Sequence, residues 1–311
     1  KALFVNRSCK PIPMIKRTLY FGNPAYLKTA NGQLVIEMHD SGETKSAPIE
    51  DVGLLILDHQ QITITQSLLA KLLANNTAVI TCDDTHHPTG MMLNLDGHTL
   101  QSQKFQAQVD ATVPLKKQLW QQTVTAKIQN QAAMLAFRKE ENKLILNLAA
   151  AVKSGDSENC EAQAAAYYWK RVFPDFLDFR RERYGPPPNN LLNYGYAILR
   201  ALVARSLVAS GLLPTLGIHH RNQYNAYCLA DDIMEPYRPY VDYVVYQLIR
   251  TNGKFLEMSP SMKKALLEIP AIDVVIDGKK SPLMNAVQRT TASLARCFEG
   301  TTRKLLYPEF E

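Results

Sequence analysis

The fold class depends on the stretch from residue 115 to residue 139, LKKQLWQQTVTAKIQNQAAMLAFRK. It contains no Gly or Pro and consists largely of helix-favouring residues, and Pro114 precedes it as a start signal. We therefore predict a long helix over Leu115–Lys139. The sequence before Gly97 consists instead of short apolar runs separated by turns, so the chain changes from strand-forming to helix-forming character near that glycine.

Residues 14–97 predict a small β-rich domain. Asn31-Gly32 indicates a tight hairpin turn between the strands Ala25–Thr29 and Gln33–Glu37. The continuous apolar run VGLLIL, Val52–Leu57, predicts a strand buried on both faces. The remaining elements predicted here are the strands Lys45–Pro48, Ile62–Thr65, Ala78–Thr81 and Met91–Leu95 and a helix over Ser67–Asn75, with Ser67 as its N-cap.

Residues 98–311 predict an all-helical domain. The run RRERYGPPP, residues 180–188, must be loop because consecutive prolines exclude helix. Asn190–Ser210 has an apolar stripe at helical spacing and is ended by Gly211. Further helices are predicted over Leu144–Lys153, Ser157–Val172, Tyr240–Arg250 and Met284–Phe298. The expected fold class is α+β: a small β-rich N-terminal domain followed by an all-α C-terminal domain.

The positive charge of the chain is concentrated in its C-terminal part. The net charge of the 311 residues is +6, and residues 1–95 are neutral, with eight basic and eight acidic residues. The whole surplus therefore falls in residues 96–311. A basic excess on one domain suits a polyanionic partner such as nucleic acid, although many proteins without such a partner look the same.

Cysteine usage and hydropathy indicate a cytoplasmic protein. The five cysteines are scattered and include no C-x-x-C pair, so we expect free thiols in a reducing compartment. No run of eighteen apolar residues occurs, so we expect no membrane span. The first patterned residue is Met14. We expect it to be the natural start, with residues 1–13 an upstream extension or a cloning remnant.

Glu161 lies on a predicted helix face with small and apolar residues. Its neighbours three, four and seven positions later are Ala164, Ala165 and Tyr168. A carboxylate there loses hydration unless a cation or hydrogen bonds compensate, which would suit a metal ligand. The alternative is a first-turn glutamate stabilised by the helix dipole, as Glu158 would also be. The pattern alone leaves both interpretations open.

A second group of chemistry-bearing residues lies in LGIHHRNQYNAYCLADDIMEPYRP, residues 216–239. His219 and His220 follow a predicted helix end and so lie at a corner between helices. Asp232 and Glu235 are three positions apart, and a helical turn would place both on one face. One imidazole with two or three carboxylates is a ligand set that suits Mg²⁺ or Mn²⁺.

Structural alternatives exist for these residues too. Either histidine could be a buried side chain with satisfied hydrogen bonds, and Asp231 could cap the helix that follows it. Spacing alone does not establish that Glu161 converges with them.

At these residues the sequence resembles the CRISPR-associated integrase and endonuclease family, the Cas1 proteins, in the form encoded by type II systems and in particular subtype II-C. The resemblance runs from Met14 to the C-terminus. The matching motifs are MIKRTLYFGNPAYL (14–27), GDSENCEAQAAAYYW (155–169), NNLLNYGYAILRA (189–201), LGIHHR (216–221) and DDIMEPYRPYVD (231–242). Four of them in the right order are specific, and the prolines at 186–188 depart from the pattern only locally.

The resemblance implies roles for the candidate site residues. Glu161, His220 and Glu235 would be the catalytic metal ligands. His219 is separated from His220 by one alignment step and remains the alternative to it. Asp232, in the family's D-x-x-D/E arrangement, would complete the shell through water or a second metal. The implied cofactor is Mg²⁺ or Mn²⁺.

The resemblance also implies partners and an activity. The N-terminal domain would form a homodimer, and two dimers would flank Cas2 in a heterohexameric complex of the prokaryotic cytoplasm. The assembly would capture short double-stranded foreign DNA. It would then join the 3′-OH ends to the CRISPR repeat beside the leader, by transesterification at phosphorus.

Candidate DNA contacts come from the predicted helical domain. Lys153, Arg221 and Arg238 lie next to the ligand motifs and could bind phosphate. Asn193 and Tyr194 could also contact DNA, but a tyrosine in an apolar helix is more often part of a core.

Two other functions compete with integration. One is a free-standing metal-dependent nuclease that cuts branched DNA without joining strands. The other is a catalytically silent DNA-binding scaffold, in which Glu161→Ala or His220→Ala would cost no chemistry.

Overall fold

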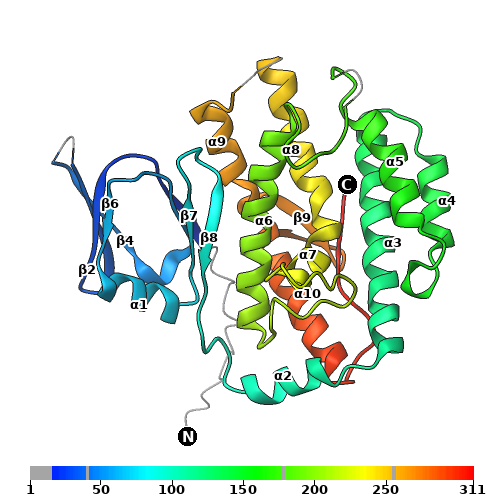
Figure 1. Cartoon of the computed structure of the whole chain (residues 1–311), viewed down its shortest axis with the longest axis horizontal. Helices are drawn as coiled ribbons and strands as arrows, with labels where there is room; N and C mark the ends of the chain where they lie inside the picture. Colours follow the sequence, from blue (N-terminus) through cyan, green and yellow to red (C-terminus); the bar gives the residue numbers. More distant parts are fainter. Residues whose placement is uncertain (1–15, 40–41, 177–178, 254–256) are drawn as a thin grey trace, which may run out of the picture.

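The computed structural model describes residues 16–39, 42–176, 179–253 and 257–311. The segment predicted to be an upstream extension, 1–13, and the expected start at Met14 lie outside these residues. Figure 1 shows a β-rich part beside a larger, mainly helical part, with β8 next to α6 where the two meet. The predicted α+β class is confirmed.

The β-rich part contains two four-stranded sheets with one helix. The first has the order β1-β5-β7-β8 and the second has the order β4-β3-β2-β6. Its elements are β1 (Arg17–Phe21), β2 (Ala25–Ala30), β3 (Gln33–Met38), β4 (Thr44–Pro48), β5 (Val52–Leu57), β6 (Ile62–Ile64), α1 (Gln66–Ala74), β7 (Ala78–Cys82) and β8 (Pro88–Met92). The predicted Asn31-Gly32 turn connects β2 and β3, which pair antiparallel, and both turn residues have positive φ.

Strand β5 is buried on both faces, as its apolar run predicts. It lies between β1 and β7 and pairs parallel with both. Leu54 and Ile56 belong to the large core shared with the helical part, whereas Val52 and Leu55 belong to a second core that includes residues of α1. The alternating side chains of one strand therefore join two cores, which fixes the sheet against the helices.

The C-terminal part is built around two long helices, α3 and α6. Most residues of α6 are buried, because it packs against α7, α8, α9 and α10 and also against β7 and β8. The elements are α2 (Gln101–Val109), α3 (Val113–Phe137), α4 (Lys143–Ala151), α5 (Cys160–Val172), α6 (Asn189–Ala209), α7 (Cys228–Met234), α8 (Arg238–Asn252), α9 (Pro260–Leu267), β9 (Asp273–Ile276), β10 (Lys279–Pro282), α10 (Leu283–Phe298) and β11 (Pro308–Glu309).

The C-terminal part is not wholly helical, which corrects the all-α expectation in one detail. β9 pairs antiparallel with β10 and with β11. Asp277 and Gly278 both have positive φ and form the turn between β9 and β10. The strands have two to four residues, which is short for a periodicity signal, and β11 comes from a distant part of the chain.

The start of α1 also differs from the prediction. Thr65, not Ser67, is its N-cap, and its side chain accepts a hydrogen bond from the backbone N–H of Leu68. Both residue types are good caps, so the sequence does not distinguish two positions two residues apart.

Two expectations concern the chain as a whole. In the described ranges no helix combines the length and the apolar character needed to cross a membrane. The described cysteines Cys82, Cys160, Cys228 and Cys297 are free thiols, as expected.

Candidate functional site

Glu161 lies in the first turn of α5, with its carboxylate toward α3. Asp156 caps this helix, since its two oxygens accept the backbone N–H groups of Cys160 and Glu161 at 2.8 and 3.0 Å. Glu158 does not share the role of Glu161, because it is exposed and pairs with Lys153 at 2.5 Å. The Glu161 side chain is 23% exposed, so it is largely buried but still accessible to solvent.

Glu235 begins the short 3-10 helix Glu235–Tyr237, directly after α7. Pro236 is well placed there because the second residue of a helical turn needs no N–H. The Glu235 side chain is nearly buried, and one of its oxygens lies 2.9 Å from Nε of Arg238. Burial alone would raise the pKa of Glu235, but the positive charges of Arg238 and Lys127 outweigh it and lower the pKa.

Lys127 of α3 connects these two glutamates. Its Nζ lies 2.6 Å from Oε1 of Glu161 and 2.6 Å from Oε2 of Glu235. Burial alone would lower the pKa of Lys127, but the Glu235 and Glu161 carboxylates raise it overall. Glu161 and Glu235 therefore share one buried ammonium group.

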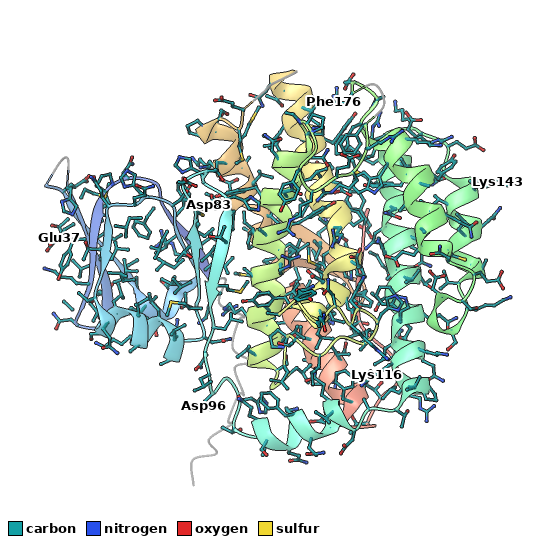
Figure 2. The ribbon with its side chains drawn as sticks, viewed as in Figure 1. Glu37, Asp83, Asp96, Lys116, Lys143 and Phe176 are labelled. Carbon is teal, nitrogen blue, oxygen red and sulfur yellow. The ribbon has the colours of Figure 1, made fainter. Side chains whose placement is uncertain are left out.

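Lys127 was not predicted from the sequence. Lys127 lies on the same face of α3 as Trp120, Val124, Gln131 and Met134, which are all buried. This position is the feature of the sequence that could have indicated its burial. A lysine on such a face needs a partner of opposite charge. Side chains fill the space between the ribbons of α3 and α6 in Figure 2. Lys127 of α3 is one of the buried charged residues of this part of the chain.

Asp232 is fully buried in α7 and faces the loop that carries both histidines. Oδ2 accepts the backbone N–H groups of Ile218 and His219 at 2.7 and 2.9 Å. Oδ1 accepts the backbone N–H of His220 at 3.2 Å and lies 2.5 Å from Nδ1 of the same residue. Four contacts occupy its two oxygens, and this favours an orienting role for Asp232 over direct metal binding.

The two histidines have different surroundings. His219 stacks on Trp120, with ring centroids 4.1 Å apart and an interplanar angle of 3°. Burial lowers its pKa. His220 has its Nδ1 engaged by Asp232, and this hydrogen bond raises its pKa, with smaller contributions from Glu235 and Glu161. His220 therefore keeps Nε2 available for a ligand, and it lies in the electrostatic field of the two glutamates. Both features favour His220 over His219 as the candidate metal ligand.

Asp231 has a structural task outside this group. One of its oxygens lies 2.6 Å from Nε of Arg200, and the other accepts a hydrogen bond of 2.7 Å from the Asn225 side chain. The cap position of α7 belongs to Tyr227, so the alternative of Asp231 as the N-cap does not hold.

The candidate DNA contacts lie in unlike places. Lys153 is exposed and paired with Glu158, and Arg221 is exposed. Arg238 pairs with Glu235 and lies over the ring of Tyr196, so its charge stabilises the Glu235 carboxylate. The side-chain oxygen Oδ1 of Asn193 accepts a hydrogen bond from Arg181. Tyr194 is only 1% exposed, and it therefore has the core role that its apolar helix indicated as the alternative.

The side chains of Glu161, Glu235 and His220 suit a hard divalent cation in chemistry. Carboxylate oxygens with one imidazole match Mg²⁺ or Mn²⁺. Across the described ranges, however, no three Asp, Glu, His or Cys side chains form a ready-made metal site. The Lys127 ammonium lies between the two carboxylates. Oε2 of Glu235 is buried with this ion pair but without a well-formed hydrogen bond, so it is an oxygen that a cation could take over.

Comparisons with known proteins agree on one family. The family model described as CRISPR associated protein Cas1 matches residues 19–259. The CRISPR-associated endonuclease Cas1 of Neisseria meningitidis serogroup C is 34% identical over 303 residues, which cover 95% of this chain and 97% of that protein.

Two solved structures share the fold. One is a casposase bound to integration product, with a TM-score of 0.79, 20% identity, and coverage of 93% of this chain and 92% of that one. The other is a Cas6-RT-Cas1–Cas2 complex, with a TM-score of 0.73, 21% identity, and coverage of 94% of this chain and 36% of that one.

Proposed function

The chain belongs to the Cas1 family of CRISPR-associated proteins, and from this premise we propose that it is a metal-dependent DNA integrase of spacer acquisition. In this role it joins the 3′-OH ends of captured DNA to the CRISPR repeat. The relative from Neisseria is named an endonuclease. The observation that carries the proposal is the convergence of Glu161 and Glu235, from separate parts of the chain, on the buried ammonium of Lys127. His220 lies in the electrostatic field of both glutamates.

The residues divide into holding and orienting roles. Glu161 and Glu235 would hold a divalent cation through carboxylate oxygens, and His220 would add Nε2. Such a cation, Mg²⁺ or Mn²⁺, supplies charge stabilisation at the phosphate under attack. Asp232 keeps the His220 ring in one orientation through Nδ1, an arrangement common behind metal-binding histidines.

Transesterification at phosphorus needs no protein nucleophile. The attacking group is the 3′-OH of the DNA, and the protein contributes positioning and charge. The same residues would hydrolyse DNA if water replaced that hydroxyl. We propose that two glutamates, a histidine and an orienting aspartate, together with a divalent cation, would serve both reactions.

DNA and Cas2 are the proposed partners. The fold is shared with a casposase bound to integration product and with a Cas1–Cas2 complex, and this supports both. The basic surplus in residues 96–311 suits a phosphate backbone. We propose a homodimer that assembles with Cas2 into a heterohexamer and acts on double-stranded prespacer and repeat DNA.

Strand joining to a repeat-bearing plasmid tests the proposal. Glu161→Ala and His220→Ala should each abolish joining of a 3′-OH DNA in the presence of Cas2 and Mn²⁺. Glu158→Ala is the matched control: it lies in the same segment as Glu161 but is exposed and bonded to Lys153, so joining should be unaffected.

The assay also separates the competing functions. Metal-dependent cutting of branched DNA with no joining, even with Cas2 present, would indicate a free-standing nuclease. Joining that persists in both Glu161→Ala and His220→Ala would overturn the site. DNA binding that is unchanged in both variants, with no joining or cutting by the wild type, would favour a DNA-binding scaffold.

A further inference from the structure

We propose that Lys127 is a built-in counterion of the metal site, which holds Glu161 and Glu235 together before the metal binds and is displaced when it does. This inference rests on the proposed metal dependence. It adds a step that the ligand set alone does not contain: metal binding exchanges one cation for another at the same two carboxylates.

The geometry of the ammonium group carries the proposal. One nitrogen, Nζ of Lys127, lies 2.6 Å from an oxygen of Glu161 and 2.6 Å from an oxygen of Glu235. The two glutamates come from different segments, and nothing in their local sequence requires them to meet. The position of the ammonium is therefore the position between the two proposed ligands, where a shared divalent cation would bind.

Burial makes the counterion necessary in the metal-free protein. The Lys127 side chain is 11% exposed, and that of Glu235 is 7% exposed. Two carboxylates brought together in such surroundings repel one another strongly unless a positive charge lies between them. Arg238 reaches only the other oxygen of Glu235, so Lys127 is the group that neutralises the pair.

The displacement is physically accessible. Mg²⁺ binds carboxylate oxygens at about 2.1 Å and would draw the two glutamates onto itself. A lysine has a flexible four-carbon chain, so its ammonium can leave while the α3 backbone stays in place. The site therefore exchanges its cation without refolding, and wild-type metal affinity is reduced by the competition.

Replacing Lys127 by methionine tests the exchange directly. Lys127→Met keeps the length of the side chain and removes its charge. Without metal, the midpoint of thermal unfolding should fall, and Mn²⁺ should raise it more than in the wild type. In calorimetry the variant should bind Mn²⁺ about tenfold more tightly, because no resident cation has to be expelled.

Lys104→Met is the matched control. Lys104 has nearly the same exposure, 12%, and a carboxylate partner at the same distance, since its Nζ lies 2.6 Å from Glu299. It should lose stability without any change in Mn²⁺ affinity. Equal or weaker Mn²⁺ binding by Lys127→Met, while the wild type binds, would overturn the counterion role and leave the proposed function intact. Absence of Mn²⁺ binding in both proteins would overturn the metal dependence and this inference together.

Chemical labelling of the wild-type protein keeps the test independent of the variant's folding. An amine-acetylating reagent, read by mass spectrometry, should modify Lys127 slowly in metal-free protein. Addition of Mn²⁺ should raise the labelling of Lys127 several-fold while that of Lys104 stays constant. Labelling of Lys127 that Mn²⁺ leaves unchanged would contradict displacement.

Discussion

Oδ1 of Asp232 lies 2.5 Å from Nδ1 of His220, and the same carboxylate also accepts the backbone N–H groups of the loop that carries His220. One buried side chain thus fixes both the position of the loop and the orientation of the imidazole ring. Because Nδ1 is engaged, only Nε2 of His220 can face a metal or a substrate.

Replacement of Asp232 by asparagine should therefore weaken metal binding without removing a ligand. We expect Asp232→Asn to reduce Mn²⁺ affinity and strand joining by about 10- to 100-fold, which is the usual cost of losing such a partner. Calorimetry and the plasmid-joining assay measure the two effects. Asp231→Asn, which disturbs only contacts to Arg200 and Asn225, is the control and should keep Mn²⁺ affinity. Wild-type affinity in Asp232→Asn would show that His220 needs no orienting partner.

Gly217 is a second position where a small change should reach the site. A Cβ atom there would lie 2.4 Å from the carbonyl oxygen of His220 and 2.8 Å from Oδ2 of Asp232. Gly217→Ala should therefore push the loop off Asp232 and lower joining activity by about tenfold or more, because small misplacements at an active site are costly. Circular dichroism should remain native. The neighbouring variant Leu216→Ala, at an exposed side chain, should retain activity, and equal activity of both variants would contradict this account.

Asp242 makes stability depend on pH. Burial raises its pKa to about 6 from the ordinary 3.8, although Tyr196 and Tyr168 donate hydrogen bonds to it. A carboxyl group whose pKa is higher in the folded than in the unfolded protein contributes its full stabilisation below the unfolded pKa. This stabilisation is lost as the pH rises through the folded pKa. Relative to Asp242→Asn, the wild type should lose on the order of 3 kcal/mol between about pH 4 and pH 6. Urea unfolding at several pH values measures this difference, and a difference that is flat with pH would refute it.

The β-rich and helical parts should be held together by a buried ion pair. Lys263 of α9 lies 2.8 Å from Oδ2 of Asp58, which follows β5 and also accepts a hydrogen bond from Tyr20. Lys263→Met should cost about 3–5 kcal/mol of unfolding free energy, because it removes the lysine cation from a buried carboxylate that then keeps its contacts with Tyr20 and His86. Adding Asp58→Leu should recover part of that loss in chemical denaturation. A double variant that is less stable than Lys263→Met would contradict the expectation.

Much of the fold is predictable from local pattern. The long helices α3 and α6 and the buried strand β5 have strong and continuous signals, so their type and approximate bounds follow from the sequence. The β9–β11 sheet does not, because its strands are short and one of them is brought in from the C-terminal segment. Such pairings depend on tertiary contacts rather than on periodicity.

The site is predictable only in part for a similar reason. The resemblance predicted Glu161, His220 and Glu235 as metal ligands, and spacing alone could not bring them together. Helical spacing placed Asp232 beside Glu235 but did not indicate that its oxygens turn back toward His220. Lys127 could not be predicted, because a lysine in a helix is usually on the surface. Its burial follows only from the packing of α3 against the segments that carry Glu161 and Glu235.

The dispersal of the proposed ligands along the chain has a consequence for how the protein matures. Lys127 and Glu161 are 34 positions apart, and Glu235 comes from a still later segment. Closing these loops costs entropy that is recovered only when the helices pack, so we expect the carboxylates to meet late in folding. A nascent or damaged chain would then lack the means to break a phosphodiester bond.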